Sequence, residues 1–535
     1  MNAPTVSPLA ARPPAPTFGA TSSATSSTAK IAGRVSAVQI KSAAAYLALL
    51  AVTTVIAAQS AMAPWSEFTP KTADQGIFFY EGQLLLEGDA PYVDFFDHKG
   101  PLIFLVNALG GVLGGRIGVW PIEILALFFA GMACLRALAP IFGRWPGFLA
   151  AASLLIICGK YLEEGNMTEE YCLPLAVIAF AVLARFATSR RISRSSSLIM
   201  GLTGTGAFLF RPTELILWAV FCLAILIVLL RQRRSREALA ATGWFLIGSL
   251  VVALPTAVWL VSKGALAAGF EQMILFNAGY SGRRGLVNAI VTAGQFLNGY
   301  DIYLAVTATA GLALWLRLGR GCPKLPRSGL IWLAIVNLIA MPVMFAIIVW
   351  PGRFYPHYMM QFLPLYVLPL GAVWYAIIRL IRRRTLLTAT ASGLAVLGLV
   401  LAVLWPGFQA SRTWAASVSA GSTPPAFDQL VDVIRQNTTP DQPIQVGGSQ
   451  SWIYLEADRR APTRYHYIPF IGRGWEELRA EGMGAISDAE PKVVVDVGEV
   501  LLYGGFDFSP YDMVFSTQAQ YPTMFMFEVY VRHEP

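Results

Sequence analysis

Charged side chains gather in one short stretch of this chain, from Asp74 to Pro101, which reads DQGIFFYEGQLLLEGDAPYVDFFDHKGP. Only 13% of the 535 residues are charged, so this density is out of proportion to the rest of the chain. A carboxylate is suited to take a proton from a hydroxyl group, and a lysine is suited to hold a phosphate. Asp74 is therefore a candidate general base, and Lys99 is a candidate anion-binding residue.

Structural roles also fit residues of this stretch. Asp74 precedes the apolar run IFFYEGQLLL and could be the N-cap of a helix that lies on a membrane surface. Lys99 comes just before an apolar run and could anchor it at the membrane interface. Glu81, Glu87 and Asp89, taken singly, fit a solvated loop. The chemical and the structural interpretation both stay open at these positions.

Two further segments place ionisable side chains between apolar runs. EEGNMTEE carries Glu169 and Glu170, and RFYPHY carries Arg353, His357 and Tyr358. Ionisable residues are costly at membrane depth, so a cluster of them at the mouths of helices is a functional-site hypothesis. An exterior hairpin is the structural alternative for the first segment, and interfacial anchoring is the alternative for the second.

A glycine-containing segment, Ala265 to Asp301, includes the sequence FNAGYSGRRG. It is long for a loop without structure, and loops of this length often act as lids. Arg283 and Arg284 could meet a phosphate there. A plain exterior loop fits the segment equally well.

Composition describes the scaffold that must hold these residues. Apolar residues make up 55% of the chain, and its mean hydropathy is +0.55. Many apolar runs reach the ~20 residues that a membrane-spanning helix needs. The sequence therefore predicts an all-α, polytopic membrane protein. The net charge of +8 lies in short clusters between these runs, which indicates membrane orientation rather than a nucleic-acid partner.

Basic residues set the expected orientation through the positive-inside rule. Arg34 and Lys41 precede the first span, Ala43 to Ala63, so we expect the N-terminus in the cytoplasm and the Asp74 stretch outside. Residues 1–41 are rich in Ala, Pro, Ser and Thr, which predicts a disordered cytoplasmic segment. Later spans are expected at 101–135, 145–161, 171–184, 198–210, 214–230, 238–261, 302–316, 330–350, 362–378 and 386–405.

The region at 101–135 is too long for one helix and carries GGVLGGRIG in its middle. It fits one span with a broken or interfacial segment, or two short helices. Parity favours one net crossing here, which gives about 11 spans in all. The transmembrane catalytic domain is then expected at 42–405, with exterior loops at 64–100 and 262–301.

The tail, residues 406–535, has a different composition and is expected to lie outside. AFDQLVDVIRQ and WEELRAE predict helices, whereas PIQVGG and PKVVVDVG predict strands. We therefore expect a small C-terminal α/β extracytoplasmic domain. It shows no catalytic constellation, so we assign it to acceptor binding or to packing over the site.

No cofactor is indicated by the sequence. All five cysteines lie in or beside the membrane half, which predicts neither a disulfide framework nor a zinc site, and nothing indicates another divalent metal. The motifs GxGxxG, HExxH and GxSxG are absent. Asn166 and Asn437 begin triplets that match the glycosylation sequon, which is a weak signal.

Taken together, these segments resemble glycosyltransferase family 39. This family contains the bacterial relatives of the protein mannosyltransferases and the lipid A aminoarabinose transferases, and it has the GT-C fold. The resemblance covers residues 43–405 and rests on the acid after the first span, the segment GDAPYVDFFDHKGP, the later acidic residues and the R…HY segment. HKGP is the most specific of these pieces.

The resemblance implies a transferase that takes a sugar from a polyprenyl-phosphate carrier on the outer face of the cytoplasmic (inner) membrane. It implies that Asp74 is the base, that Lys99 contacts the donor phosphate, and that Glu169 or Glu170 forms the second acidic site. The chain departs from the mannosyltransferases at Gln75, where they carry a glutamate. Protein O-mannosylation is therefore not implied.

Physical reasoning leads to the same chemistry. A lipid phosphate departs without a proton, so the catalyst needs a base for the acceptor hydroxyl and cations for the phosphate. A single displacement would invert the anomeric carbon. We expect an inverting glycosyltransferase embedded in the lipid bilayer, with a glycan, lipid or protein of the cell envelope as acceptor. Donor-phosphate binding is assigned to Lys99, Arg353, His357, Arg283 and Arg284, and substrate binding to Asp97, His98, Glu169, Glu170 and Tyr358.

A transporter or flippase of a lipid-linked substrate is the alternative, because it also needs many spans and polar residues along a pathway. Two features favour the enzyme: the charges gather at one face rather than at the bilayer midplane, and no inverted repeat is visible. A noncatalytic membrane scaffold that presents the tail domain is a third hypothesis.

Overall fold

The computed structural model describes residues 43–69, 71–282, 285–298, 327–382, 425–467, 476–517 and 526–533. The chain divides into two units, Met1–Ala48 and Leu49–Pro535. Of the first unit, the described part is only the beginning of helix Ala43–Ala57. The predicted disordered segment, the spans predicted at 302–316 and 386–405, and the two arginines Arg283 and Arg284 lie outside the described residues.

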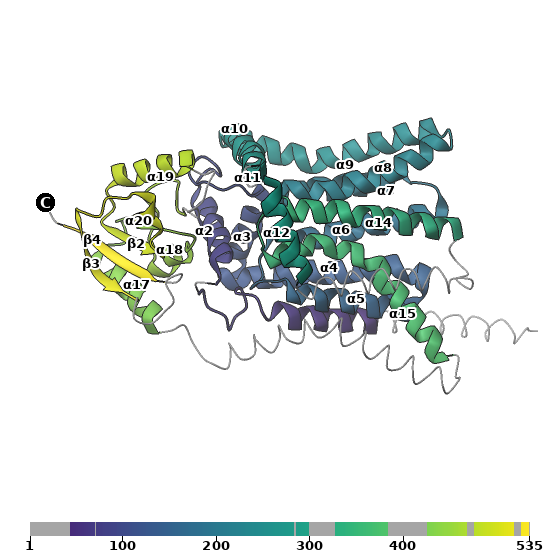
Figure 1. Ribbon diagram of the computed structural model, residues 1–535, viewed down its shortest axis with the longest axis horizontal. Helices are drawn as coiled ribbons and strands as arrows, with labels where there is room; N and C mark the ends of the chain where they lie inside the picture. The colour runs from purple at the N-terminus through teal and green to yellow at the C-terminus, as the bar shows by residue number, and fades with distance from the viewer. Residues whose placement is uncertain are drawn as a thin grey trace, which may run out of the picture. The chain divides into compact units, whose positions relative to one another are not determined.

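Helices long and apolar enough to cross a membrane dominate the second unit (Figure 1). Because of these spans, the protein is a multi-pass membrane protein, as predicted. The crossing number of about 11 is not established, since several other helices are shorter, among them α5 (Arg144–Lys160) and α7 (Arg194–Phe210). Among the described residues, the six candidate spans are Arg116–Phe142, Thr168–Ser189, Pro212–Arg231, Ser235–Ser262, Ser328–Val349 and Pro356–Arg379.

Each of these six spans contains one long helix of the bundle. They are α4 (Arg116–Phe142), α6 (Thr168–Ser189), α8 (Leu215–Arg231, after the 3-10 turn Pro212–Glu214), α9 (Ser235–Ser262), α14 (Arg327–Val349) and α15 (Val367–Arg382, after the 3-10 helix η4, Pro356–Tyr366).

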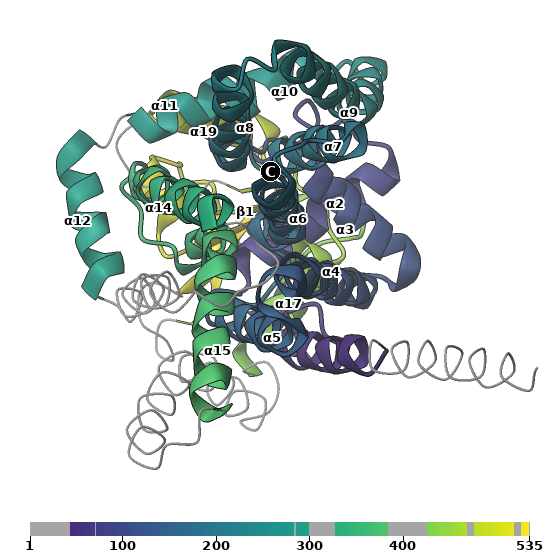
Figure 2. The same cartoon turned by 90° about the vertical axis from the view of Figure 1, so that its right-hand side faces the viewer.

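The bundle is built from neighbouring pairs of these helices, which Figure 2 shows end on. Helix α4 packs against α5 and α6, α6 packs against α7 and α14, and α7 packs against α9. Gly201 and Gly248 lie where α7 and α9 cross, and a Cβ at either would overlap a backbone carbonyl of the other helix. Small residues allow the close approach that membrane helices use in place of hydrophobic driving force.

The region at 101–135 forms two helices, α3 (Pro101–Gly114) and α4, which was one of the predicted alternatives. Gly115 separates them with φ of 65° and ψ of −147°, a conformation that is essentially restricted to glycine. Helix α3 has 14 residues, about 21 Å, which is shorter than the ~30 Å hydrocarbon core of a bilayer.

Helix α2 (Ala73–Glu87) lies against α3. A Cβ at Gly82 would come within 2.7 Å of Asn107, which shows how closely the two helices cross. The other side of α2 packs against a helix of the C-terminal domain, and most of α2 is buried. The N-cap residue is Thr72, so Asp74 lies within the first turn and is not the cap. The structure thus contradicts the capping interpretation of Asp74.

The exterior segment predicted as a long loop at 262–301 is helical where it is described. It contains α10 (Leu266–Phe270), a π-helical turn (Glu271–Phe276), α11 (Asn277–Gly282) and α12 (Gly285–Asn298). These residues are therefore helical, and both the lid and the plain exterior connection stay predictions. The physical reason is visible in the sequence EQMILF and LVNAIVTAGQFLN, which provides apolar residues at helical spacing.

The C-terminal part forms the expected α/β arrangement. Its sheet has the order β1-β2-β4-β3, in which β1 and β2 are parallel and the other neighbours are antiparallel. The strands are β1 (Ile444–Val446), β2 (Val493–Val497), β3 (Tyr511–Ser516) and β4 (Phe527–Arg532), and the helices are α17 (Pro425–Asn437), α18 (Trp452–Ala457), α19 (Glu476–Ala489) and α20 (Val500–Gly504).

All four elements predicted for this domain are present, as α17, β1, α19 and β2. Every residue of β2 is buried, as its run VVVDV predicts for a strand covered on both faces. Strands β3 and β4, which complete the sheet, were not predicted. The predicted domain boundaries at 41/42 and 405/406 stay predictions.

Candidate active site

The loop between α2 and α3 is held by its own side chains and by the π-helical turn. Tyr92 donates its hydroxyl proton to the carbonyl of Lys99 at 2.8 Å, and the carboxylate of Asp97 accepts the Lys99 backbone N–H at 2.8 Å. Gln272 donates to the carbonyl of Tyr92 at 2.7 Å, and Asn277 donates to the carbonyl of His98 at 2.7 Å. These bonds fix the backbone from which the Lys99 side chain projects.

Glycine is required at the third position of HKGP. The Gly100 N–H donates to the carbonyl of Phe210 at 3.1 Å, and a Cβ on Gly100 would overlap the carbonyl of Leu209 at the end of α7. Pro101 then begins α3 at a position where proline fits well. The loop is therefore attached to the end of α7, directly beside Arg211.

Three cationic side chains come together around His98. Burial lowers the pKa of His98 well below its ordinary value, and the charges of Lys99, Arg211 and Arg353 lower it further. His98 is therefore neutral near pH 7. The Lys99 ammonium makes no hydrogen bond or ion pair with any residue in the described ranges. This group of cations is suited to an anion such as a phosphate.

A second group of side chains surrounds Arg211. Its guanidinium forms an ion pair with the buried carboxylate of Glu169 and lies 4.2 Å from the ring centre of Tyr358. His357 lies 3.9 Å from Glu169 and pairs more closely with Glu163. Glu169 of the EEGNMTEE segment thus lies near His357 of the RFYPHY segment, and Arg211 connects Glu169 with Tyr358.

Gln75 connects α2 to the EEGNMTEE segment. Its side-chain amide donates to the carbonyls of Glu163 and Gly165, at 2.7 Å in each case, and Gln75 is 1% exposed. A carboxylate has no proton to donate to these carbonyls. The departure from the Asp-Glu pattern at this position therefore has a structural reason.

Glu170 does not join the cationic group. Its carboxyl lies inside the bundle beside that of Glu123 on α4. The Glu123 carboxylate accepts hydrogen bonds from the Ser60 hydroxyl at 2.8 Å and from the Asn166 backbone at 2.6 Å. Asn166 in turn bonds to Asn107 at 2.8 Å and is fully buried, so this sequon is not accessible in the folded chain.

Glu81, Asp97 and His466 form a buried group that includes the C-terminal domain. All three are at most 1% exposed, and His466 lies 3.3 Å from Glu81. Burial raises the pKa of Glu81 and of Asp97, while burial lowers the pKa of His466 to about 3. The two carboxyl groups lie close enough to affect each other's pKa, and the Glu81 oxygens make no hydrogen bond among the described residues. Tyr467 is also within hydrogen-bonding reach of Asp97.

Asp74 lies one to two turns before Glu81 on α2, and its charge acts on both Glu81 and Tyr467. Its side chain is partly exposed and makes no hydrogen bond or ion pair among the described residues. A partly accessible carboxyl group without a cation partner among the described residues is suited to accept a proton.

The C-terminal domain also contacts α2 and its loop through several direct bonds. Tyr80 stacks on Tyr454 with ring centres 4.9 Å apart and accepts a hydrogen bond from the backbone of Ala461 at 2.9 Å. The Phe96 N–H donates to the carbonyl of Arg464 at 3.0 Å. Helix α18 approaches α2 so closely that a Cβ at Gly76 would lie 2.8 Å from Trp452.

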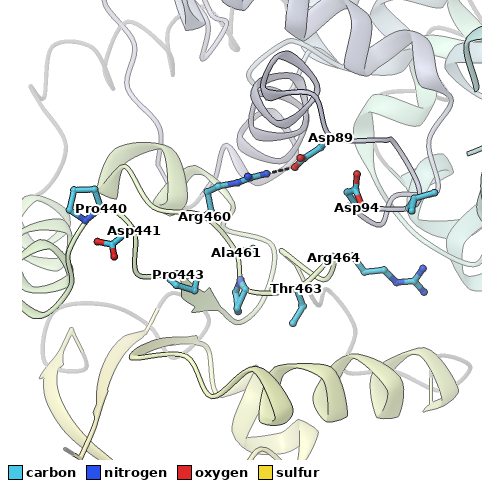
Figure 3. Close-up of a pocket in the computed structure, with 11 residues that line it drawn as sticks. Asp89, Asp94, Pro440, Asp441, Pro443, Arg460, Ala461, Thr463 and Arg464 are labelled. Atoms are coloured by element: carbon cyan, nitrogen blue, oxygen red, sulfur yellow. Dashed lines mark hydrogen bonds and ion pairs between the residues drawn. The ribbon is translucent and has the colours of Figure 1, made fainter. Parts of the chain in front are cut away.

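An open cavity of about 580 Å³ lies where this loop meets the C-terminal domain (Figure 3). Arg460 points across it and forms an ion pair with Asp89, while Arg464 and Asp94 lie farther along the same wall. Asp441 lies on the opposite side of the cavity. The lining carries both charges and is suited to a polar ligand.

The structure brings together most of the predicted site residues: Asp97, His98, Lys99, Glu169, Arg353, His357 and Tyr358. It separates Glu170 from them, since that side chain points into the bundle. Sequence reasoning missed the roles of Gln75, Glu81, Arg211 and His466. Arg211 carried a detectable signal, a lone arginine at the end of an apolar run. His466 carried none, because its partner is distant in the chain.

No group of three or more histidine, cysteine or acidic residues in the described ranges could hold a metal ion.

The fold defined by these helices occurs in known membrane transferases. ArnT from Cupriavidus metallidurans bound to undecaprenyl phosphate is 14% identical, with a TM-score of 0.57 over 91% of this chain and 97% of that chain. ArnT in the apo state is 13% identical, with a TM-score of 0.56 over 92% of this chain and 98% of that chain. The chain therefore has the GT-C fold.

A more distant likeness involves the archaeal oligosaccharyltransferase AglB from Archaeoglobus fulgidus, which is 14% identical, with a TM-score of 0.49 over 91% of this chain and 74% of that chain. Residues 35–384 match the family model described as "Putative competence-induced protein Ccs4 N-terminal domain". The chain belongs to this family. No curated protein matches the sequence.

Proposed function

We propose that this protein is an inverting glycosyltransferase that moves a sugar from a polyprenyl-phosphate carrier to an acceptor on the outer face of the cytoplasmic membrane. The observation that carries the proposal is the group of cations, Lys99, Arg211 and Arg353, around the neutral His98. A lipid phosphate at this position would have its negative charge near three cations and its apolar chain in the bilayer. The shared fold with ArnT, which binds undecaprenyl phosphate, supports it.

Asp74 is assigned as the general base. It would take the proton of an acceptor hydroxyl while the oxygen forms a bond to the anomeric carbon of the donor sugar. The bond from that carbon to the phosphate oxygen breaks in the same step, and the polyprenyl phosphate leaves as an anion without a proton. One displacement of this kind inverts the anomeric carbon. Its partly exposed carboxylate and its free oxygens support the role.

Lys99 is assigned to the donor phosphate, with Arg353, His357 and Tyr358 beside it. Developing phosphate charge is stabilised most by cations that are fixed before the reaction. The bonds that hold the Lys99 backbone support such a preorganised position. Glu169 is already paired with Arg211 and is therefore assigned to position that arginine. Arg283 and Arg284 stay candidates for the same phosphate.

The acceptor is assigned to the side of the C-terminal domain. The open cavity bordered by Arg460, Asp94 and Asp441 has a polar, mixed-charge lining that suits a hydroxylated glycan or a glycan-bearing lipid. It is continuous in sequence with the His466 segment, which contacts Glu81. Experiment must identify the acceptor class, the sugar and the carrier.

The decisive experiment is an assay of the purified full-length protein with a panel of polyprenyl-phosphate sugars and a cell-envelope extract as acceptor. We expect release of free polyprenyl phosphate and transfer of label to the acceptor with one of the donors. The same protein is also reconstituted into liposomes. If it moves a lipid-linked substrate across the liposome membrane without any release of polyprenyl phosphate, the flippase alternative is established.

A further inference from the structure

An apolar groove lies between α7, α8 and α9, and none of its lining residues belongs to the proposed active site. Its volume is about 320 Å³, within the range of ligand-binding pockets. Apolar side chains from all three helices form its wall, and several of them, such as Leu223, are exposed on the helix surface. The lining residues include Met200, Ile225, Leu226, Leu229, Ala241 and Phe245.

One polar atom in this wall has no partner. The Ser197 side chain lines the groove and is 1% exposed, and its hydroxyl makes no hydrogen bond within the described part of the chain. An unpaired buried hydroxyl is costly. It is suited to donate to a carbonyl oxygen of a molecule that occupies the groove.

A second, basic cavity of about 470 Å³ adjoins one end of the groove. Ile192 lines both, so the two are contiguous. The basic cavity is lined by Arg190, Arg191 and Arg234 and by a single carboxylate, Glu237. It therefore has an excess of positive charge at the mouth of an apolar channel.

The arginines at this mouth are held to different degrees. Arg234 pairs with Glu237, with Nε 3.1 Å from the carboxylate, and Arg190 donates to the carbonyl of Ser328 at 3.0 Å. Arg191 is exposed, and its guanidinium makes no bond to a described residue. Two guanidinium groups are thus positioned by protein contacts, and a third can turn toward a ligand.

We propose that this composite site binds an anionic glycerophospholipid from the membrane leaflet that faces these arginines. The phosphodiester would lie among Arg190, Arg191 and Arg234, one acyl chain would occupy the groove, and an ester carbonyl would accept the Ser197 hydroxyl proton. In a glycerophospholipid the ester groups lie between phosphate and chain, the order found here. Charge complementarity selects an anionic lipid over a zwitterionic one. The site does not depend on the proposed transferase activity.

Native mass spectrometry of the full-length protein, with phosphatidylglycerol and phosphatidylcholine of identical acyl chains, tests the headgroup. We expect preferential retention of phosphatidylglycerol, and a weakening of about fivefold in Arg191→Gln, the contribution typical of one basic residue near an anionic surface. Arg236→Gln, which changes an exposed arginine on α9 outside the cavity, is the matched control and should retain the preference. Equal retention of the two lipids by the unaltered protein would overturn the proposal.

A second pair of variants tests the groove. Ala241→Phe fills it and should reduce phosphatidylglycerol retention, whereas Leu246→Phe, at an exposed position on the same helix outside the groove, should not. Ser197→Ala should weaken retention with unchanged thermal stability, because the hydroxyl has no partner in the protein. Competition by inorganic phosphate as effective as that of the lipid would show a free-anion site and overturn the lipid assignment.

Discussion

The protein buries two pairs of neighbouring carboxyl groups, and their surroundings differ. Glu123 and Glu170 lie inside the helix bundle, where hydroxyl and amide groups such as that of Ser60 complete the network. Glu81 and Asp97, here called the exterior pair because they lie outside the helix bundle, are next to His466 from the C-terminal domain. The hydrogen bonds to the Glu123 carboxylate come from a hydroxyl and a backbone N–H, whereas the Glu81 carboxyl lies beside an imidazole.

This difference separates burial from function. Both pairs are fully desolvated, so desolvation alone does not distinguish them. The exterior pair is connected through the Asp97 carboxylate to the backbone of Lys99, and the charge of Asp74 acts on it. We therefore infer that the exterior pair supports the active site and that the bundle pair stabilises the fold.

The strongest test of this contrast is Asp74→Asn against Glu170→Gln. If Asp74 is the base, its amide variant should lose about a hundredfold to ten-thousandfold in turnover with a lipid-phosphate sugar, because the proton has no acceptor. Glu170→Gln, once folded, should retain most of its turnover. Thermal unfolding in detergent verifies that both variants are folded.

The reverse result would break the contrast. A folded Asp74→Asn protein with near-normal turnover would move the base to Glu169, Glu170 or Asp97, or would refute the transferase function altogether. A folded but inactive Glu170→Gln protein would place the bundle pair in the mechanism.

A smaller effect is expected for Lys99→Ala. Removal of one charge-assisted contact to the donor phosphate should raise the KM for the donor on the order of tenfold or more. Lys99→Arg keeps the charge but not the compact ammonium and should recover part of the affinity. The measurement is turnover at limiting donor concentration. Unchanged turnover in Lys99→Ala would mean that the lysine is only an interfacial anchor.

The exterior site also shows how far a sequence can be interpreted. HKGP and the acidic segments predicted the loop, the fold and most residues of the cationic group, because local motifs carry that information. The contacts of Glu81 could not be predicted, since its partner His466 is 385 positions away and neither has a periodic neighbour. For Asp74 the sequence left a helix cap and a general base open, and the cap does not hold because the N-cap residue is Thr72.

The connection between helix α2 and the EEGNMTEE segment can be broken at Gln75. Gln75→Glu removes both hydrogen bonds to the carbonyls of Glu163 and Gly165 and places a carboxylate against them. We expect a loss of about 1 to 3 kcal/mol in the free energy of unfolding. Gln83→Glu on the same helix is the control, because the Gln83 amide bonds to no carbonyl among the described residues. Equal unfolding temperatures for the two variants would contradict the bridging role.

The smallest expected effect is a change in stability with pH, and it tests the exterior pair directly. Burial, and then the charge of Asp97, hold the pKa of Glu81 well above its ordinary value of 4.5. A carboxyl whose pKa is raised by folding stabilises the fold fully below that ordinary value. It loses this contribution as the pH rises through the folded pKa. The pKa of His466 is lowered to about 3, so its contribution is present above pH 6.5 and is lost on acidification.

The two groups therefore act in different pH ranges, and from pH 6.5 to 8.5 the difference between the unaltered protein and a Glu81 variant reports on the carboxyl pair. The unaltered protein should become less stable across this range, by at most about 1.4 kcal/mol per pH unit for one proton. Glu81→Gln cannot ionise and should flatten the profile, whereas Glu87→Gln, at an exposed position of α2, should leave it unchanged. Unfolding followed by tryptophan fluorescence measures all three proteins. Parallel profiles of stability against pH for the unaltered protein and Glu81→Gln would mean that the exterior pair holds no extra proton. The inferred difference between the exterior pair and the bundle pair would then be wrong.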